Sequence, residues 1–197
     1  IEPEKLCLYM IQVAQALDFL NSRKHRIDSR IVGLQHGDVK PNNILVIGDQ
    51  VKLADYGLAA PTSGPVIPCQ RHGTLEYCAP EVFNGKLTDW SDQYSFAVSY
   101  FVLRTGAFPF PTPPDPTRVS LRNYQRPDPD LTALTVPERP VLARALSTIP
   151  QQRFPTCQHF ISAILSALKL RVRTGANGTL EITSEGDNRN SGSQMIH

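Results

Sequence analysis

The chain has 197 residues, which is enough for one ordinary domain with a sizeable core. Hydrophobic residues make up 41% and charged residues 19% of it, so the composition indicates a globular protein rather than a disordered one. The formal net charge is +2 and there is no long basic run, so neither nucleic acid nor a membrane surface is expected as the main partner.

Cysteine spacing and hydropathy bear on the compartment. The cysteines are widely scattered and form no pattern of close pairs, which is typical of a reduced chain: Cys7, Cys69, Cys78 and Cys157. The longest strongly apolar stretch, 95–103, has about half the length that a membrane span requires. An intracellular, cytoplasmic location is therefore expected, and a membrane anchor elsewhere in a longer parent protein stays open. The chain opens without Met on what resembles the start of a helix, which suggests a fragment.

The first third of the sequence predicts a helix followed by short strands. Residues 3–22 form an amphipathic pattern, because apolar residues recur at steps of three and four. Residues 23–30 are too charged for the core, and 31–35 fit a short strand. Two β-rich runs, 44–47 and 51–54, then flank a Gly-Asp-Gln turn and predict a hairpin.

The rest of the sequence predicts a long loop and several helices. Residues 57–74 are rich in Gly, Pro, Ser and Thr and predict a loop of functional length. Residues 89–104 are apolar almost all the way round at helical spacing, so we expect a helix buried in the middle of the domain, ended by Gly106. Prolines exclude regular structure from 108–116. Weaker helices are expected at 117–124, 138–148 and 155–169. The polar residues 170–197 are expected to form a flexible C-terminal tail.

Four polar residues flank the predicted hairpin. Asn43 directly precedes its first strand and Asp55 directly follows its second, so pairing of the strands brings the two residues together. An amide oxygen and a carboxylate suit a Mg²⁺ ion that bridges phosphate oxygens. Asp38 lies one turn away, free to accept a hydroxyl proton, and Lys40 is a point charge for a migrating phosphoryl group. These are the parts that phosphoryl transfer needs, although a solvated turn is the simpler alternative.

Five motifs carry a family resemblance. HGDVKPNN (36–43) resembles the catalytic loop of eukaryotic-type protein kinases, and DYG (55–57) resembles their DFG element. GTLEYCAPE (73–81) resembles the end of the activation segment, and SDQYSFAVSYFVLRTGAFPF (91–110) resembles the buried central helix. Arg153 stands where the family keeps an arginine that pairs with the glutamate of APE. Each string alone is weak, but five in this order and spacing are specific.

The resemblance covers about residues 1–169 and implies a mainly helical fold with small β-hairpins, the C-terminal lobe of the two-lobe α+β kinase fold. It implies that Asp38 is the catalytic base, that Lys40 contacts the γ-phosphate of ATP, and that Asn43 and Asp55 bind Mg²⁺. Lys40 together with Thr74 resembles the serine/threonine-specific branch, in which the two side chains hold the catalytic aspartate.

The resemblance also implies structural supports. Asp92 is expected to accept hydrogen bonds from the backbone of the catalytic loop, and Glu81 is expected to form a buried pair with Arg153. His36 is expected to be a packed, structural histidine rather than a catalytic one.

One departure from the family pattern concerns regulation. Gly37 stands where many kinases have an arginine that receives a phosphate on the activation loop. Phosphorylation of Thr62, Ser63 or Thr74 is therefore expected to matter less, and alanine at both Thr62 and Ser63 is expected to leave the activity of a full-length parent nearly unchanged. Tyr56 in place of phenylalanine is a mild change.

A second departure concerns nucleotide binding. The sequence has no G-x-G-x-x-G loop and no VAIK-like strand lysine, the parts that grip adenine and the α- and β-phosphates. The N-terminal lobe is therefore expected in a parent protein longer by about 100 residues. This chain alone is expected to transfer phosphate barely at all.

Three functions follow as alternatives. The first is Mg²⁺-dependent phosphoryl transfer from ATP to serine or threonine hydroxyls of a protein substrate. The second is a small-molecule phosphotransferase of the choline- or aminoglycoside-kinase type, which shares the H-G-D string; Lys40, the 73–81 segment and the helix with Asp92 disfavour it. The third is a non-catalytic kinase-like scaffold, which the retained Asp38, Asn43 and Asp55 disfavour.

Overall fold

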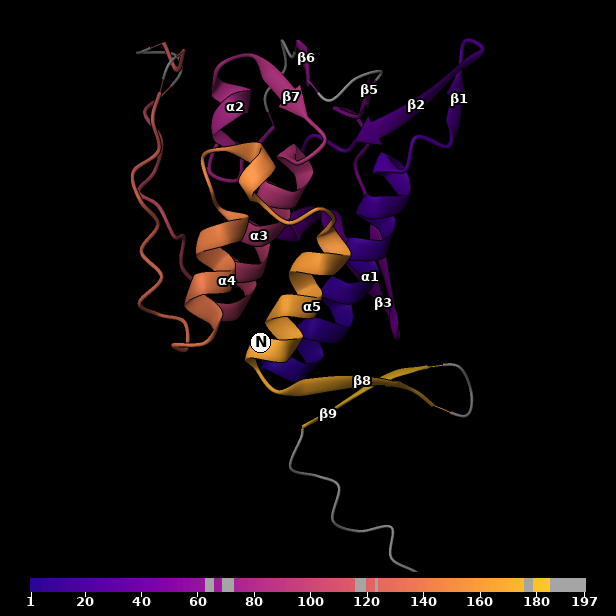
Figure 1. Ribbon diagram of the computed structural model, residues 1–197, viewed down its shortest axis with the longest axis vertical. Coiled ribbons are helices and arrows are strands. Elements are labelled where there is room, and N and C mark those ends of the chain that lie inside the picture. The colour runs from indigo at the N-terminus through magenta and orange to yellow at the C-terminus, as the bar shows by residue number, and fades with distance from the viewer. Residues whose placement is uncertain (63–65, 69–72, 116–119, 123, 176–178, 185–197) are drawn as a thin grey trace, which may run out of the picture.

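A computed structural model describes residues 1–62, 66–68, 73–115, 120–122, 124–175 and 179–184. Four helices lie side by side in the middle of the molecule, with small sheets gathered around them (Figure 1). The helices are α1 (Pro3–Asn21), α3 (Ser91–Thr105), α4 (Glu138–Ala145) and α5 (Cys157–Ala167). The expectation of a mainly helical fold with small hairpins is therefore confirmed.

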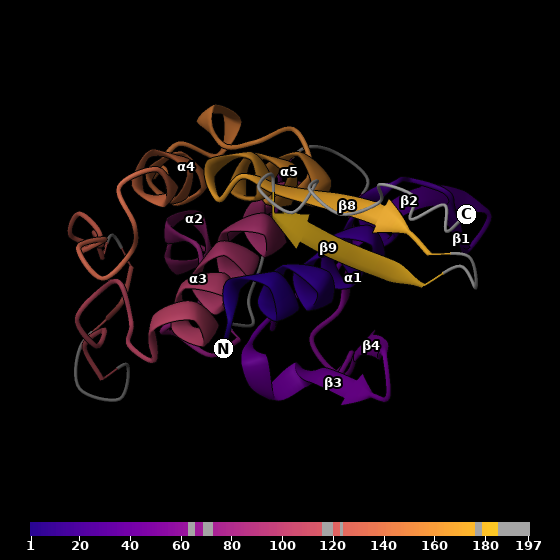
Figure 2. The same ribbon diagram turned by 90° about the horizontal axis from the view of Figure 1, so that it is seen from below.

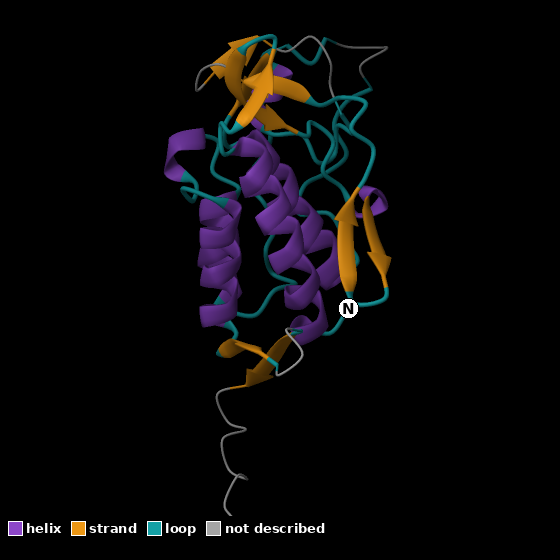
Figure 3. Cartoon of the chain, turned by 90° about the vertical axis from the view of Figure 1, so that its right-hand side faces the viewer, coloured by secondary structure: helices purple, strands orange, loops and turns teal. Residues whose placement is uncertain are grey.

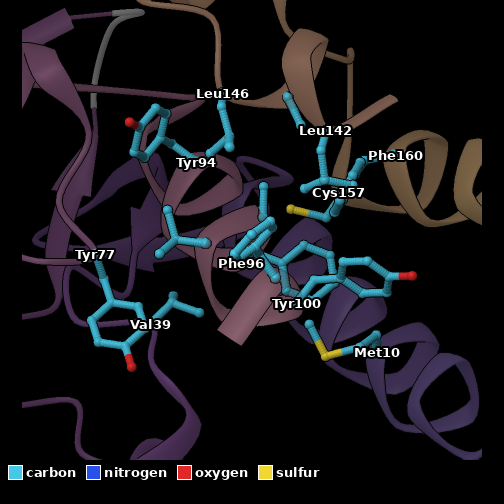
Figure 4. Close-up of a cluster of buried hydrophobic side chains, with 14 of the residues drawn as sticks. Met10, Val39, Tyr77, Tyr94, Phe96, Tyr100, Leu142, Leu146, Cys157 and Phe160 are labelled. Carbon is cyan, nitrogen blue, oxygen red and sulfur yellow. The ribbon is translucent and has the colours of Figure 1, made fainter. Parts of the chain in front are cut away.

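Helix α3 is the centre of the hydrophobic core. Tyr94, Phe96 and Tyr100 project from it among side chains of the other three helices, including Met10 of α1 and Phe160 of α5 (Figure 4). Phe96 and Phe160 meet edge to face with ring centroids 5.7 Å apart. Burial of each such side chain stabilises the fold by about 2 kcal/mol. The all-round apolar pattern of 89–104 thus predicted the buried position correctly.

A buried carboxylate ties α4 to α3. Glu138 is fully buried, and its Oε1 accepts hydrogen bonds from Tyr100 Oη at 2.7 Å and from Arg104 Nε at 3.3 Å. Its Oε2 accepts from the backbone N–H and the hydroxyl of Thr135, at 3.1 and 2.7 Å. These partners satisfy a charge that would be costly to bury alone.

Two small antiparallel sheets lie at one end of the helices, and a separate hairpin lies beside α1 (Figure 3). The first sheet has the order β1-β2-β5, and β6 pairs with β7 in the second. The separate hairpin is β3–β4, in the register that pairs Ile44 with Leu53. The strands are β1 (His25–Ile27), β2 (Arg30–Gln35), β3 (Ile44–Ile47), β4 (Gln50–Leu53), β5 (Ala60–Thr62), β6 (Val66–Pro68) and β7 (Lys86–Thr88).

The segments expected to be irregular differ from the structure. The loop predicted over 57–74 contains β5 and β6, because β2 and β7 offer edges with which they pair. The charged stretch 23–30 contains β1 and turns back on itself through Asp28 and Ser29, with φ of 46° and 65°. Its side chains stay mostly exposed, as the charge predicted.

The weaker helices are partly confirmed. Helix α4 ends at Ala145 rather than at residue 148, and the backbone N–H of Leu146 donates to Leu142 O at its end. The helix expected at 117–124 is absent from residues 120–122 and 124, and the other residues of that range lie outside the described part of the chain. Pro109 O accepts a hydrogen bond from Asp130 N at 2.8 Å.

The prediction that a flexible tail begins at residue 170 is wrong for residues 170–174 and 180–184, which form strands. Strands β8 (Leu170–Thr174) and β9 (Leu180–Ser184) form an antiparallel hairpin that packs against α1 and α5 (Figure 2). Leu170 is buried, and Leu180 and Ile182 pack against the core. Apolar residues that alternate with polar ones supply this inner face. Residues 185–197 lie outside the described part of the chain.

Three short helical segments complete the described structure: the α-helix α2 (Pro80–Phe83) and the 3₁₀ helices η1 (Pro41–Asn43) and η2 (Pro150–Gln152). Within the ranges that the structure describes, no helix combines the length and the apolar character needed to cross a membrane.

Candidate active site

Asp38 lies in the loop between β2 and β3, at the centre of a closed hydrogen-bond network. Its Oδ2 accepts a hydrogen bond from Lys40 Nζ at 2.8 Å, and its Oδ1 accepts from the backbone N–H and the hydroxyl of Thr74 at 2.8 and 2.9 Å. Lys40 Nζ also donates to Thr74 Oγ1 at 2.7 Å. The Asp38 carboxylate is therefore fixed by Lys40, two residues along the same loop, and by Thr74, 36 residues away in the sequence.

The network keeps Asp38 ionised. Partial burial acts to raise the pKa of Asp38, but the hydrogen bonds from Lys40 and Thr74 outweigh it and hold the pKa below its ordinary value. The side chain of Asp38 is only 10% exposed, so the carboxylate is fixed by its partners rather than by bulk water. An ionised, oriented carboxylate is the form that can accept a proton.

Asn43 and Asp55 occupy adjacent positions at the open end of the β3–β4 hairpin. Asn43 O accepts a hydrogen bond from the backbone N–H of Ala54 at 2.8 Å, and Ala54 directly precedes Asp55. Asn43 Nδ2 donates to the backbone oxygen of Asp38 at 2.8 Å, which leaves its Oδ1 as the atom that can face a cation. Asp55 is exposed and accepts one hydrogen bond, from Gly57 N at 3.3 Å.

The backbone at Asp55 has an uncommon conformation. Its φ is 64°, in the left-handed region that residues other than glycine adopt only rarely. Such backbone persists where the surrounding structure imposes it, which occurs most often at functional positions. An amide oxygen and a free carboxylate at the same end of a hairpin form a donor set that fits Mg²⁺, a hard cation that prefers oxygen.

His36 joins the loop to the segment around Asp55. Its ring is fully buried, and Nε2 lies 2.9 Å from the carbonyl oxygen of Ala54. Nδ1 accepts from the backbone N–H of Asp38 at 3.3 Å, so Nε2 carries the proton in a neutral ring. The ring of Tyr56 packs on it with centroids 4.8 Å apart. Among the described residues, these contacts of His36 join the loop backbone to Ala54 and Tyr56.

Asp92, at the start of α3, holds the other side of the loop. Its two carboxylate oxygens accept hydrogen bonds from the backbone N–H groups of His36 and Gly37, at 2.6 and 3.0 Å. Complete burial raises the pKa of Asp92, and the two backbone donors act against that rise. The expected contact between Asp92 and the loop backbone is present.

Two glycines permit close approach at the site. Gly37 has φ of 80°, and an added Cβ would lie 2.9 Å from the carbonyl oxygen of Leu58. The backbone therefore disfavours an arginine at this position. Gly73 packs against the loop so closely that an added Cβ would collide with Gly37 O and lie 2.8 Å from Asp38 Oδ1. Thr74 reaches Asp38 only because its neighbour has no side chain.

The expected pair of Glu81 and Arg153 is present and bidentate. Arg153 Nη1 and Nη2 donate to the two carboxylate oxygens of Glu81 at 2.9 and 2.8 Å, and both residues are buried. Burial acts to raise the pKa of Glu81, but Arg153 outweighs it and holds the pKa below its ordinary value. Thr88 and Ser91 also donate to Glu81, so this carboxylate connects α2 to β7 and α3.

The structure adds Arg126, which the sequence did not single out. Its side chain is buried and donates to the backbone oxygens of Leu75, Glu76 and Cys78, the residues that directly follow Thr74. A single arginine among prolines gives no sequence signal for this contact. Arg126 is therefore a positioning residue for the segment that carries Thr74.

The site residues of the sequence analysis thus fall into one connected region. Asp38, Lys40 and Thr74 touch one another, and Asn43 and the segment at Asp55 touch the same loop. The two remaining expectations about the loop region concern phosphorylation. Thr62 is buried on β5, and Ser63 lies outside the described residues.

Comparison with known proteins identifies the family. A family model described as the protein kinase domain matches residues 1–180. The chain belongs to the protein kinase family. The kinase match extends past α5 through β8 to the first residue of β9, so the C-terminal hairpin falls within it.

Curated relatives are similar over most of this chain. PknF, a serine/threonine-protein kinase of Mycobacterium tuberculosis, is 34% identical in an alignment 167 positions long that covers 77% of this chain and 32% of PknF. An Aurora kinase of Dictyostelium discoideum is 33% identical over 74% of this chain and 35% of its own length. A kinase named drp72 of Corynebacterium efficiens is 30% identical over 85% of this chain and 31% of its own length. The chain thus spans about a third of the length of these relatives.

Proposed function

We propose that these residues are the C-terminal lobe of a serine/threonine protein kinase, which transfers the γ-phosphate of ATP to serine or threonine hydroxyls of proteins. The lobe is proposed to extend past residue 169 into the β8–β9 hairpin, because the family model matches residues 1–180 and Leu170 lies in the core. The single observation that carries the proposal is the network of Asp38, Lys40 and Thr74, because it presents an ionised carboxylate beside a fixed cation. The names of the relatives support this proposal, because two are called serine/threonine-protein kinases and the third is called an Aurora kinase.

Each residue has a proposed role in the reaction. Asp38 orients the attacking hydroxyl and accepts its proton, and Lys40 balances negative charge on the transferring phosphoryl group. Asn43 Oδ1 and the Asp55 carboxylate would hold Mg²⁺, which neutralises the phosphate oxygens when it is bound. Thr74 fixes Asp38 and shapes the place of the target hydroxyl.

A carboxylate with a lowered pKa suits this chemistry. It stays ionised at neutral pH, so its main task is to orient the hydroxyl and to take the proton late, as the bond to phosphorus forms. Catalysis then depends on position and charge more than on proton affinity.

The small-molecule phosphotransferase is the second candidate. The segment 74–78 disfavours it, because Arg126 holds this segment through several backbone oxygens beside the site, where it can face a polypeptide. A non-catalytic scaffold would not need the fixed geometry at Asp38. We also place the protein inside the cell, because the buried Cys7 and Cys157 are free thiols.

Labelled ATP separates these functions. The longest natural protein that contains these residues is incubated with Mg²⁺, labelled ATP and either casein, choline or an aminoglycoside. Label is expected on serine and threonine of casein alone. Label on choline or the aminoglycoside would establish the small-molecule function, and no transfer to any acceptor would establish the scaffold.

A further inference from the structure

A polar pocket lies beside α2. It has a volume of about 780 Å³ and is bordered by α2, β7, Arg122 and residues 124–126. Three cationic side chains line it: Lys86, Arg122 and Arg126. The acidic lining residue is Glu81, whose charge is already balanced by its bidentate contact with Arg153. The balance of charge that faces the pocket is therefore positive.

Arg126 contributes a charge that no carboxylate neutralises. The residue is 6% exposed, and its hydrogen-bond acceptors are backbone oxygens, which carry only partial charge. No described acid forms an ion pair with it, and its enclosed Nη1 has no hydrogen-bond partner among the described residues. The aromatic rings of Phe83 and Phe110 flank the guanidinium, with centroids 5.2 and 4.9 Å from Cζ.

A buried, unneutralised guanidinium favours an anion nearby. In water at physiological salt its field would be screened within about 8 Å, but protein on most sides lowers the effective dielectric constant and directs the field toward the open pocket. Because Nη1 is enclosed, Arg126 attracts an anion through its electric field and does not contact it through Nη1. The groups that contact the anion must therefore come from the edge of the pocket.

Lys86 and Arg122 are the contact groups. Both are exposed, and neither forms an ion pair within the described ranges of the chain. Lys86 is fixed on β7 through pairing with β6, and Arg122 N is fixed by Ser120 Oγ at 3.2 Å. An arginine fork and a lysine point charge together suit a group with several acceptor oxygens.

We propose that this pocket binds a phosphate monoester, carried on a serine or threonine side chain of a peptide that has already been phosphorylated. Such a group has a charge of about −1.5 to −2 at neutral pH, which three cations balance. If the proposed function holds, the 75–78 segment that Arg126 grips lies beside the substrate, so the phosphate would mark a substrate residue at a fixed distance from the target hydroxyl. The anion site itself does not depend on phosphoryl transfer.

Binding to the 197-residue chain tests the site without ATP. A degenerate library of short phosphoserine peptides, its unphosphorylated counterpart and inorganic phosphate are each titrated, with the affinity read by calorimetry and by amide chemical shifts. Phosphopeptides are expected to bind, and Lys86→Ala or Arg122→Ala should each weaken binding by about tenfold, the loss of one charge-assisted hydrogen bond. Lys24→Ala, at an exposed lysine far along the chain, is the control and should bind as the wild type does.

Each outcome decides the proposal. Equal affinity for inorganic phosphate and phosphopeptide would support the anion site and assign free phosphate as its ligand. Equal affinity for phosphorylated and unphosphorylated peptides, no binding of either, or equal losses in the Lys86 variant and the control would overturn it. Since no step uses ATP, a failure here is distinct from a failure of the kinase assay.

Discussion

Arg153 and Glu81 are 72 residues apart in the sequence and meet through two parallel hydrogen bonds of 2.9 and 2.8 Å. Glu81→Gln removes the carboxylate and leaves the Arg153 guanidinium buried without its counter-charge. The free energy of unfolding is expected to fall by about 3 to 5 kcal/mol. Urea unfolding of the 197-residue chain measures this difference.

An exposed ion pair provides the control for Glu81. Arg23 Nη2 lies 2.7 Å from Asp89 Oδ2, with the arginine side chain 44% exposed. Arg23→Ala is expected to cost less than about 1 kcal/mol, because water replaces the lost partner. A Glu81→Gln variant as stable as Arg23→Ala would show that the buried pair does not stabilise the fold.

The Glu81 carboxylate also makes the stability of the fold depend on pH. Arg153 holds the pKa of Glu81 below its ordinary value of 4.5 in the folded protein, so the unfolded chain takes up this proton first as the pH falls. The contribution of Glu81 to the unfolding free energy is expected to be constant above that value and to decrease as the pH falls through it toward the folded pKa. Glu81→Gln should flatten this decrease, and a slope identical to that of the wild type would count against the assignment.

Gly37 tests the close packing of the catalytic loop. Gly37→Ala places a Cβ at a φ of 80° and 2.9 Å from Leu58 O, so a loss of more than about 1 to 2 kcal/mol is expected. Gly48→Ala is the matched control, because Gly48 has a φ of 60° but nothing within 4 Å of an added Cβ. Thermal unfolding of both variants checks this. Equal losses would mean that the contact with Leu58 does not constrain the loop.

Substitution of Arg126 tests whether this arginine positions the segment that follows Thr74. Arg126→Met keeps an unbranched side chain but leaves the backbone oxygens of Leu75, Glu76 and Cys78 without their donor. The Thr74 amide, which donates to Asp38, is expected to exchange its hydrogen at least about tenfold faster.

The control for Arg126 is another arginine that binds backbone oxygens. Arg139 donates to Leu134 O and Thr132 O at 3.1 and 3.0 Å, away from the catalytic loop. Arg139→Met should leave exchange at Thr74 unchanged. Unchanged exchange in Arg126→Met as well would show that this arginine does not position the segment.

Periodicity and motif spacing predicted most of the fold. The steps of three and four in 3–22 and the all-round apolar pattern of 89–104 predicted α1 and the buried α3, because burial follows directly from hydrophobic residues at helical spacing. The tail was misjudged because its composition is polar. Leu170, Val172, Leu180 and Ile182 alternate with polar residues, and that period of two forms β8 and β9.

The site was predictable where its parts are consecutive in the sequence. The loop with Asp38 and the hairpin ends at Asn43 and Asp55 follow from local spacing, and Glu81 with Arg153 follow from the family pattern. Arg126 was not predictable, because its partners are backbone oxygens 48 to 51 residues away and backbone oxygens leave no trace in residue identity. The pairing of β5 with β2 and of β6 with β7 likewise depends on strand edges that only the folded chain presents.

Phosphoryl transfer by an Asp38→Asn variant tests the central claim most directly. The longest natural protein that contains these residues is assayed with Mg²⁺ and labelled ATP on casein, beside Asp49→Asn, a change at an exposed aspartate in the turn between β3 and β4. Loss of the base and its charge is expected to lower the rate by about 100-fold or more, with the Asp49→Asn rate unchanged. Transfer by Asp38→Asn at the wild-type rate would contradict the assignment of the site.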